Sequence, residues 1–174
     1  MRATPLAVTA LAAALLLTAC DSGGDSAKET GKEKSTACTL GEVSLEIGPA
    51  NAAPAAGDTG NVSVTVTNSS AQCTLDGFPG VGLHAGDSSA AVPVDKAAPS
   101  QKLTLAKGST TSFTITYVRG AEGGKSSVAA KTMKVSLPGD DADTQEFPWT
   151  YGAVALKSGD EPDATVSGFT QSGD

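Results

Sequence analysis

At 174 residues, the chain has the length of one domain with a single core plus short terminal segments. Its formal net charge of −7 disfavours binding to nucleic acid and to anionic head groups, and no nucleic-acid partner is expected. Hydrophobic residues make up 39% of the chain and aromatic residues only 4%. A core must therefore be built mainly from Val, Leu and Ile, which favours strands over helices.

The first twenty residues have the organisation of an export signal. Arg2 supplies a positive charge, and residues 6–17 form an Ala/Leu-rich run too short to span a bilayer. Leu17-Thr18-Ala19-Cys20 resembles the bacterial lipobox, in which the cysteine receives diacylglycerol and becomes the new N-terminus. The alternative is an ordinary secretory leader. We expect a lipoprotein signal peptide at 1–19 and a lipid on Cys20 that holds the protein at the extracytoplasmic face of the cell membrane.

The cysteine count agrees with this assignment. The chain has three cysteines, and if Cys20 is lipidated, Cys38 and Cys73 remain as an even pair in an oxidising compartment. A disulfide between them is then the default expectation. Residues 20–37 are polar, carry charges of both signs and have no apolar side chain larger than Ala after Cys20. Such a segment cannot bury enough surface to fold and is predicted to be a disordered tether.

Apolar residues alternate with polar or small ones along the rest of the chain, a pattern that predicts half-buried strands. No amphipathic helical stretch competes with it. About eight or nine short strands fit a two-sheet antiparallel β-sandwich of immunoglobulin-like architecture better than a parallel sheet, which needs intervening helices. We expect this all-β domain over 38–170 and a frayed tail at 171–174. The expected strands are 43–47, 62–66, 81–83, 103–105, 113–117, 133–137, 147–151, 154–156 and 165–169.

The first two strands suggest a register. Antiparallel pairing of Leu45 with Val66, and of Ile47 with Val64, keeps the apolar side chains on one face. The same register places Cys38 opposite Cys73, on the other face and beyond the regular ladder. A disulfide there restricts the unfolded chain and stabilises the domain by up to ~4 kcal/mol.

A corner follows Cys73 at Phe78-Pro79-Gly80-Val81, where the Pro-Gly pair suits the central positions of a type II turn. Together with Cys38, the strand ending Val66-Thr67-Asn68-Ser69-Ser70 and the run Cys73-Thr74-Leu75, this corner resembles the domain of unknown function 4232 family. That family occurs mostly in actinobacterial secreted and lipid-anchored proteins. The resemblance covers about residues 38–151 and implies no catalytic residue, cofactor or substrate.

Residues suited to catalysis are few. His84 is the only histidine, and the Ser88 that follows it in a Gly-Asp-Ser block has no late histidine to complete a triad. We interpret both as surface-loop residues and expect no enzymatic activity. Met133 occupies an apolar strand position, which favours a place in the core over copper ligation.

The densest carboxylate cluster contains Asp140, Asp141 and Asp143, which are candidate calcium ligands. It lacks the ligand spacing of a calcium loop. A solvated hairpin turn after Leu137-Pro138 is the favoured interpretation, and no cofactor is expected.

Three aromatic residues, Phe147, Trp149 and Tyr151, alternate with other residues and so project from one face of a strand. Pro148 cannot donate to a ladder, which favours an edge strand. Exposed, the three rings would form a binding face for sugar rings. In a domain with so few large side chains, burial in the core is favoured.

Two classes of function remain open. The first is a non-catalytic, monomeric interaction module that presents strand edges or loops to an envelope protein or wall polymer. The alternative is a small-ligand or metal carrier anchored near a transporter, with the acidic cluster and the aromatic strand as candidate sites. A pocket with convergent polar groups favours a carrier, and a flat polar surface favours a module.

Overall fold

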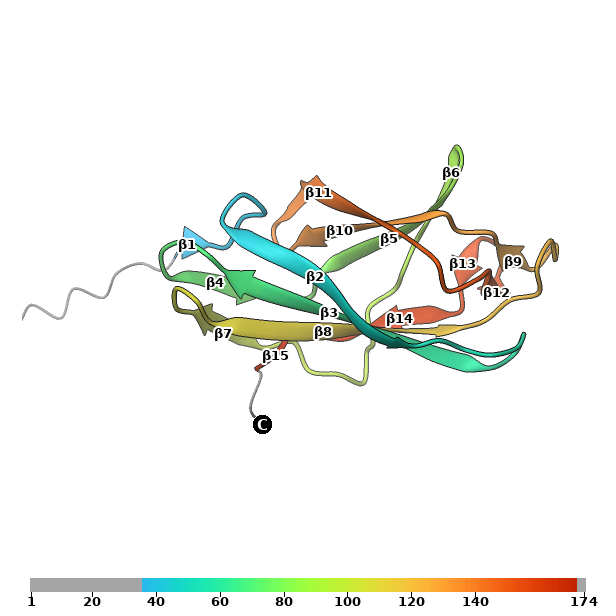
Figure 1. Cartoon of the computed structure of the whole chain (residues 1–174), viewed down its shortest axis with the longest axis horizontal. Helices are drawn as coiled ribbons and strands as arrows, with labels where there is room; N and C mark the ends of the chain where they lie inside the picture. Colours follow the sequence, from blue (N-terminus) through green and yellow to red (C-terminus); the bar gives the residue numbers. More distant parts are fainter. Residues whose placement is uncertain (1–35, 172–174) are drawn as a thin grey trace, which may run out of the picture. The chain divides into compact units, whose positions relative to one another are not determined.

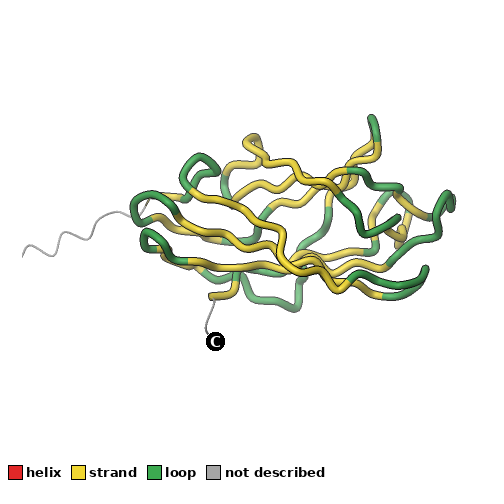
Figure 2. The backbone as a smooth tube through the Cα atoms, in the orientation of Figure 1, coloured by secondary structure: helices red, strands yellow, loops and turns green. Residues whose placement is uncertain are grey.

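The computed structural model describes residues 36–171, which all belong to one structural unit, Lys34–Asp174. Strands joined by turns and loops make up this part of the chain, and it contains no helix (Figure 1, Figure 2). Within residues 36–171 there is accordingly no helix long and apolar enough to cross a membrane. The predicted signal peptide at 1–19, the predicted lipid site at Cys20 and residues 172–174 lie outside the described residues.

Two large antiparallel sheets form the domain (Figure 1). One has the strand order β14-β8-β3-β2, with β15 also paired to β8, and the other has the order β11-β10-β5-β6. The strands of the first are β2 (Val43–Asn51), β3 (Thr59–Asn68), β8 (Thr110–Val118), β14 (Ala164–Val166) and β15 (Thr170–Gln171). Those of the second are β5 (Gly80–Ala85), β6 (Ser88–Ala91), β10 (Thr132–Leu137) and β11 (Asp140–Pro148).

Two small sheets complete the described part of the chain. One contains β1 (Thr36–Ala37), β4 (Cys73–Asp76) and β7 (Lys102–Leu105), and the other contains β13 (Glu161–Pro162), β12 (Val154–Ser158) and β9 (Ser127–Val128). Among the strands of residues 36–171, every ladder is antiparallel except that between β1 and β4.

The core lies between the two large sheets. Alternate residues of each strand point inward, as the pleat of a strand requires. The inward residues of the five-stranded sheet include Val62, Val64, Val66, Phe113, Ile115 and Tyr117, each exposing 1% or less of its surface. Val81, Leu83, Met133 and Val135 of the four-stranded sheet belong to the same buried cluster. This arrangement confirms the predicted all-β sandwich, and Met133 is a core residue.

The predicted register of the first two strands is confirmed. Leu45 pairs with Val66 and Ile47 with Val64 in an antiparallel ladder. The ladder shifts between Ile47 and Ala50, where Gly48-Pro49 interrupts it. A bulge with a proline blunts this edge of the sheet against pairing with another chain.

Cys38 and Cys73 form the predicted disulfide. Their predicted place on the face opposite the apolar set is wrong, because both residues are buried in the core at 2% and 1% exposure. The β2 ladder ends at Val43, and a turn in which Thr39 accepts the amides of Glu42 and Val43 redirects the chain. Cys38 then donates its amide to Thr74, so the bridge joins the segment after β1 to β4.

Both ends of the predicted domain extend further than expected. Thr36 and Ala37, assigned to the disordered tether, form β1 and pair with Cys73 and Thr74. Gln171, assigned to the frayed tail, pairs with Thr111 in β15. Main-chain pairing needs no large apolar side chain, so neither segment has a hydrophobic pattern that reveals it.

The predicted strand at 147–151 begins earlier and ends at Pro148 as part of β11, which is an edge strand as the proline indicated. The predicted strand at 165–169 begins one residue earlier and ends at Val166 as β14, and a separate strand, β15, starts only at Thr170. Strands β4, β6, β9 and β13 were not predicted. Each has no more than four residues, too few to show a periodic pattern.

Candidate functional site

An open groove of about 450 Å³ crosses the outer face of the four-stranded sheet. We call it the β5 groove and define it by Gly80, Gly82 and His84 of β5, Lys134 of β10, Asp141 and Thr144 of β11, and Val92 and Val94 after β6. Gly82 lies directly opposite Lys134 on one side and Ala91 on the other. Because Gly80 and Gly82 have no side chains, the main chain of β5 forms the floor.

Gly80 occupies a different structural position from the one that the Pro79-Gly80 pair predicts. It is the first residue of β5 and is not among the glycines with positive φ, so the predicted type II turn is wrong. The chain bends instead at Gly77, whose φ is 116°. Close packing favours glycine at position 80, since a Cβ there would collide with Oγ of Ser136 on the neighbouring strand unless that hydroxyl shifts.

An acidic bulge in β11 forms one wall of the groove. Leu137 pairs with Asp140 and Val135 with Gln145, so residues 141–144 lie opposite the single residue Ser136. Ser136 is only 5% exposed although it alternates with inward-facing Val135 and Leu137. Its hydroxyl lies 3.5 Å from Oδ1 of Asp141. The bulge therefore folds over the outer face of the sheet.

A hairpin turn at Pro138-Gly139 precedes this bulge. Gly139 has a φ of 87°, and Leu137 pairs with Asp140 on either side of the turn. A proline followed by a glycine of positive φ is the signature of a type II turn. The predicted hairpin is confirmed, but the acidic residues beyond it belong to a strand rather than a loop.

The opposite wall of the β5 groove is apolar. Val92 is buried and donates its amide to the carbonyl of Val81 at 2.8 Å. Val94 exposes 38% of its surface and is the exposed large hydrophobic residue of the described chain. One end of the groove thus offers aliphatic surface to a ligand, and the bulge offers polar groups.

His84 and Ser88 lie on strands rather than in the predicted surface loop. His84 is half-buried in β5, and its Nε2 would be 3.3 Å from a Cβ at Gly82, which places the imidazole over the groove floor. The Lys134 ammonium is 3.8 Å from the Glu146 carboxylate. The groove therefore contains an imidazole and a cation whose charge is partly compensated.

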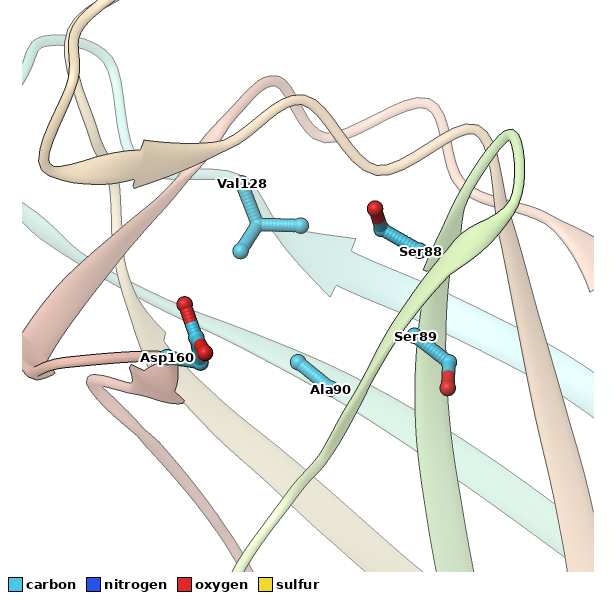
Figure 3. A pocket seen from close by; sticks show the side chains of 5 residues that line it. All are labelled: Ser88, Ser89, Ala90, Val128 and Asp160. Carbon is cyan, nitrogen blue, oxygen red and sulfur yellow. The ribbon is translucent and has the colours of Figure 1, made fainter.

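A second, smaller hollow of about 260 Å³ lies between β6, β9 and the turn from β12 to β13. We call it the Ser88 hollow. Figure 3 shows the side chains of Ser88, Val128 and Asp160 around it. One hydroxyl, one carboxylate and one aliphatic side chain therefore face a space large enough for a small polar molecule.

The three aspartates predicted as candidate calcium ligands are all exposed. Asp140 accepts the amide of Asp143 at 3.3 Å, and Asp141 contacts Ser136. Across residues 36–171, no three His, Cys, Asp or Glu side chains gather in a way that could hold a metal ion. The aspartates line the bulge and do not converge on a point.

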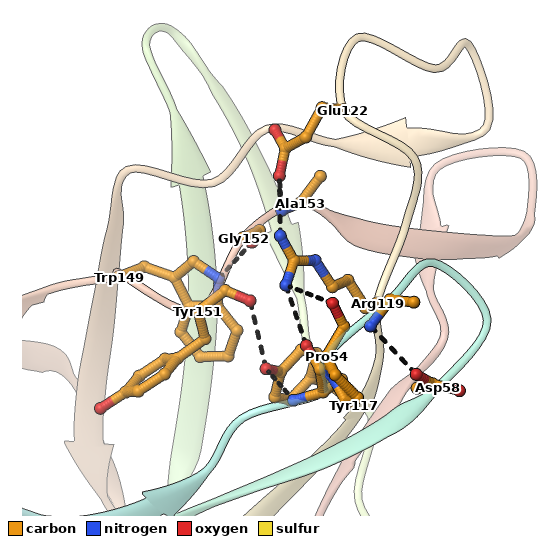
Figure 4. Close-up of polar contacts among 11 residues, drawn as sticks. Pro54, Asp58, Tyr117, Arg119, Glu122, Trp149, Tyr151, Gly152 and Ala153 are labelled. Carbon is orange, nitrogen blue, oxygen red and sulfur yellow. Dashed lines mark hydrogen bonds and ion pairs between the residues drawn. The ribbon is translucent and has the colours of Figure 1, made fainter.

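Trp149 and Tyr151 form an aromatic cluster with Tyr117 (Figure 4). Trp149 is 5% exposed, and its indole N–H donates to the carbonyl of Gly152 at 2.8 Å. Its ring packs edge-on against Tyr117 and Tyr151, with centroid separations of 5.1 and 5.0 Å. Phe147 and Tyr151 are half-buried against the core. The three rings are therefore not a row on the surface, because Trp149 points into the core.

Polar contacts hold this aromatic cluster together. The Tyr117 hydroxyl accepts the amide of Ala53 at 3.2 Å and donates to the carbonyl of Tyr151 at 3.1 Å (Figure 4). The Arg119 guanidinium donates to the carbonyl of Ala53 and lies 3.7 Å from Glu122. Partial burial, and to a smaller extent repulsion from Tyr117, raise the pKa of Tyr151. The buried rings are hydrogen-bonded to main-chain groups, so we assign this cluster a structural role.

Sequence reasoning did not identify the β5 groove. Lys134, Thr144 and Val94 are ordinary residues in isolation, and only the fold brings them together. The available signal is the alternation of Gly80 and Gly82, because two glycines on one face of a strand leave that face open.

The fold and the groove define a class of protein: a disulfide-closed β-sandwich with an open groove on one sheet. A family model described as "Domain of unknown function (DUF4232)" matches residues 38–170. The chain belongs to this family. A search of the curated proteins finds no match.

Proposed function

We propose that this protein is a non-catalytic interaction module of the cell envelope and that the β5 groove is its binding surface. The supporting observation is the construction of the groove, whose walls come from three separate segments around a glycine floor. A groove on the outer face of a sheet accepts part of a long partner that continues beyond it at both ends. An enclosed carrier site would instead surround its ligand.

The proposal includes the lipid anchor at Cys20. The apolar run, the lipobox-like sequence and the polar segment up to residue 35 support a domain displayed at the extracytoplasmic face of the membrane. We expect Cys20→Ala to abolish lipid labelling and to leave an unprocessed or released chain. A processed Cys20→Ala chain that stays in the membrane fraction would contradict the anchor.

The groove is tested by site-specific cross-linking on intact cells. A photoreactive amino acid replaces Val94, at the exposed wall of the groove, and in a matched control replaces Thr65 on the outer face of the other sheet. We expect one dominant adduct from position 94, identified by mass spectrometry, and none of the same mass from position 65. Absence of an adduct specific to position 94 would reject the groove as the binding surface.

The Ser88 hollow supports the alternative function, a small-ligand carrier. Its volume of about 260 Å³ and its lining by the Ser88 hydroxyl and the Asp160 carboxylate suit a small polar molecule (Figure 3). Native mass spectrometry of the protein purified from its own cells distinguishes the two functions. A retained small molecule that is lost in Asp160→Ala would favour the carrier, and an unliganded mass favours the module.

A further inference from the structure

We infer that the β5 groove binds a neutral, hydroxyl-rich saccharide chain, an inference that rests on the proposed function and specifies its ligand. The floor of the groove, which is the main chain of β5, gives the first reason. The main chain of β5 is paired with β10 on one side and β6 on the other. Because β5 is paired on both sides, a peptide cannot add to the sheet at the floor of the groove. Recognition must come from the side chains of the walls and from shape.

The charges in the groove disfavour ionic ligands. The Lys134 ammonium is balanced by Glu146 at 3.8 Å, and Asp141 adds a carboxylate on the same wall. With a net charge of −7, the chain as a whole repels an anionic polymer. A cation would meet the Lys134 ammonium, and among residues 36–171 no carboxylate cluster is arranged to hold one. A neutral ligand is the class that remains.

The polar groups of the groove suit hydroxyls. Lys134 donates, the Asp141 carboxylate accepts, and the Thr144 hydroxyl and the His84 imidazole can do either. A sugar hydroxyl both donates and accepts, so it can bond to each of these groups. Ser136 is a positioning residue here, because its buried hydroxyl lies against the Asp141 carboxylate that faces the groove.

The apolar wall completes the match to a sugar. Val94, exposed at 38%, presents aliphatic carbon beside the polar wall, whereas Val92 belongs to the buried core. A pyranose ring has hydroxyls at its rim and C–H groups on its faces, and an N-acetyl group adds a methyl. A sugar ring in the groove can therefore direct its hydroxyls towards Lys134 and Asp141 and its carbon surface towards Val94.

The experiment uses the full chain carrying Cys20→Ser, which cannot be acylated, labelled with nitrogen-15. The probes are a trimer of N-acetylglucosamine, a trimer of glucose, and a tetraalanine peptide as the non-saccharide control. Amide spectra are recorded during each titration. We expect at least one of the two saccharides to shift amides of Gly80–His84, Lys134 and Thr144 in a saturable way, and the peptide to leave them unchanged.

Three variants assign the binding to the groove. Gly82→Val fills the floor; its Cβ would meet only the His84 imidazole, with Nε2 at 3.3 Å, and no main-chain atom, so the fold should be retained. Lys134→Met keeps the aliphatic stem and removes the charge. Thr65→Val is the matched control on the other sheet. We expect Gly82→Val and Lys134→Met each to weaken saccharide binding by ~tenfold or more, and Thr65→Val to leave it unchanged.

Each other outcome overturns the inference. Saccharide shifts confined to Tyr151 or to the Ser88 hollow would place the site elsewhere. If neither saccharide binds while position 94 cross-links a protein on cells, the interaction module stands and its ligand is not a saccharide. If neither saccharide binds and position 94 captures nothing, the inference and the proposed function both fail.

Discussion

At the scale of single residues, Gly80 shows how a close approach between strands determines the residue type. The space that a side chain would fill at position 80 is taken by the Ser136 hydroxyl, which in turn holds Asp141 of the bulge. Because position 80 has no Cβ, the Ser136 hydroxyl can lie against the floor of the β5 groove and contact Asp141 in its acidic wall.

Because Gly80 and Ser136 share this space, the effects of their mutations on stability should not be additive. Gly80→Ala should lower the free energy of unfolding by ~1–3 kcal/mol, because its methyl group overpacks the contact with Ser136. In the double variant with Ser136→Ala, the colliding hydroxyl is absent and much of that loss should be recovered. Chemical denaturation of the two single variants and the double variant measures the coupling. Additive losses would show that the two residues do not share this space.

Trp149 provides a second residue-scale prediction. Its ring is buried between two tyrosines, and its N–H bonds to the Gly152 carbonyl. Trp149→Ala should therefore cost ~3 kcal/mol or more of stability. Val94→Ala, at an exposed position, serves as the control and should stay within ~0.5 kcal/mol of wild type. An unshifted denaturation midpoint for Trp149→Ala would contradict its place in the core.

At the scale of elements, strands with an apolar face can be predicted from sequence, whereas strands paired mainly through the main chain cannot. Residues 62–66 and 113–117 alternate cleanly because one face of each strand packs in the core. The first half of β11 is exposed along its length, and Ser88–Ala91 contains only small side chains. Neither segment has an apolar period, so their pairing depends on neighbouring strands that the local sequence does not specify.

The β1 segment should depend on the disulfide. Cys38 follows β1 directly and is bonded to Cys73 of β4, so the bridge holds β1 beside its partner strand. The double variant Cys38→Ala with Cys73→Ala should lose up to ~4 kcal/mol of stability. Hydrogen exchange should show that the amides of β1 lose protection before those of β3. Unchanged protection of β1 would show that main-chain pairing alone holds it.

At the scale of the whole molecule, the candidate site was less predictable than the fold. The alternation of Phe147, Trp149 and Tyr151 made them a candidate binding face. Their large side chains instead pack in or against a core that has few other aromatic residues. The β5 groove combines residues from distant parts of the chain. Its floor is open because Gly80 and Gly82 have no side chains. A surface of this kind becomes visible only when the strand order is known.

We expect the outer face of the four-stranded sheet to be the surface by which this protein engages the cell envelope. Co-sedimentation with isolated envelopes tests it most directly, using the Cys20→Ser chain so that a lipid cannot cause retention. We expect saturable binding of this chain, retained binding when Thr65→Val is added and loss of binding when Gly82→Val is added. Equal sedimentation of the chains carrying Gly82→Val and Thr65→Val, or no sedimentation of the parent chain, would contradict the claim.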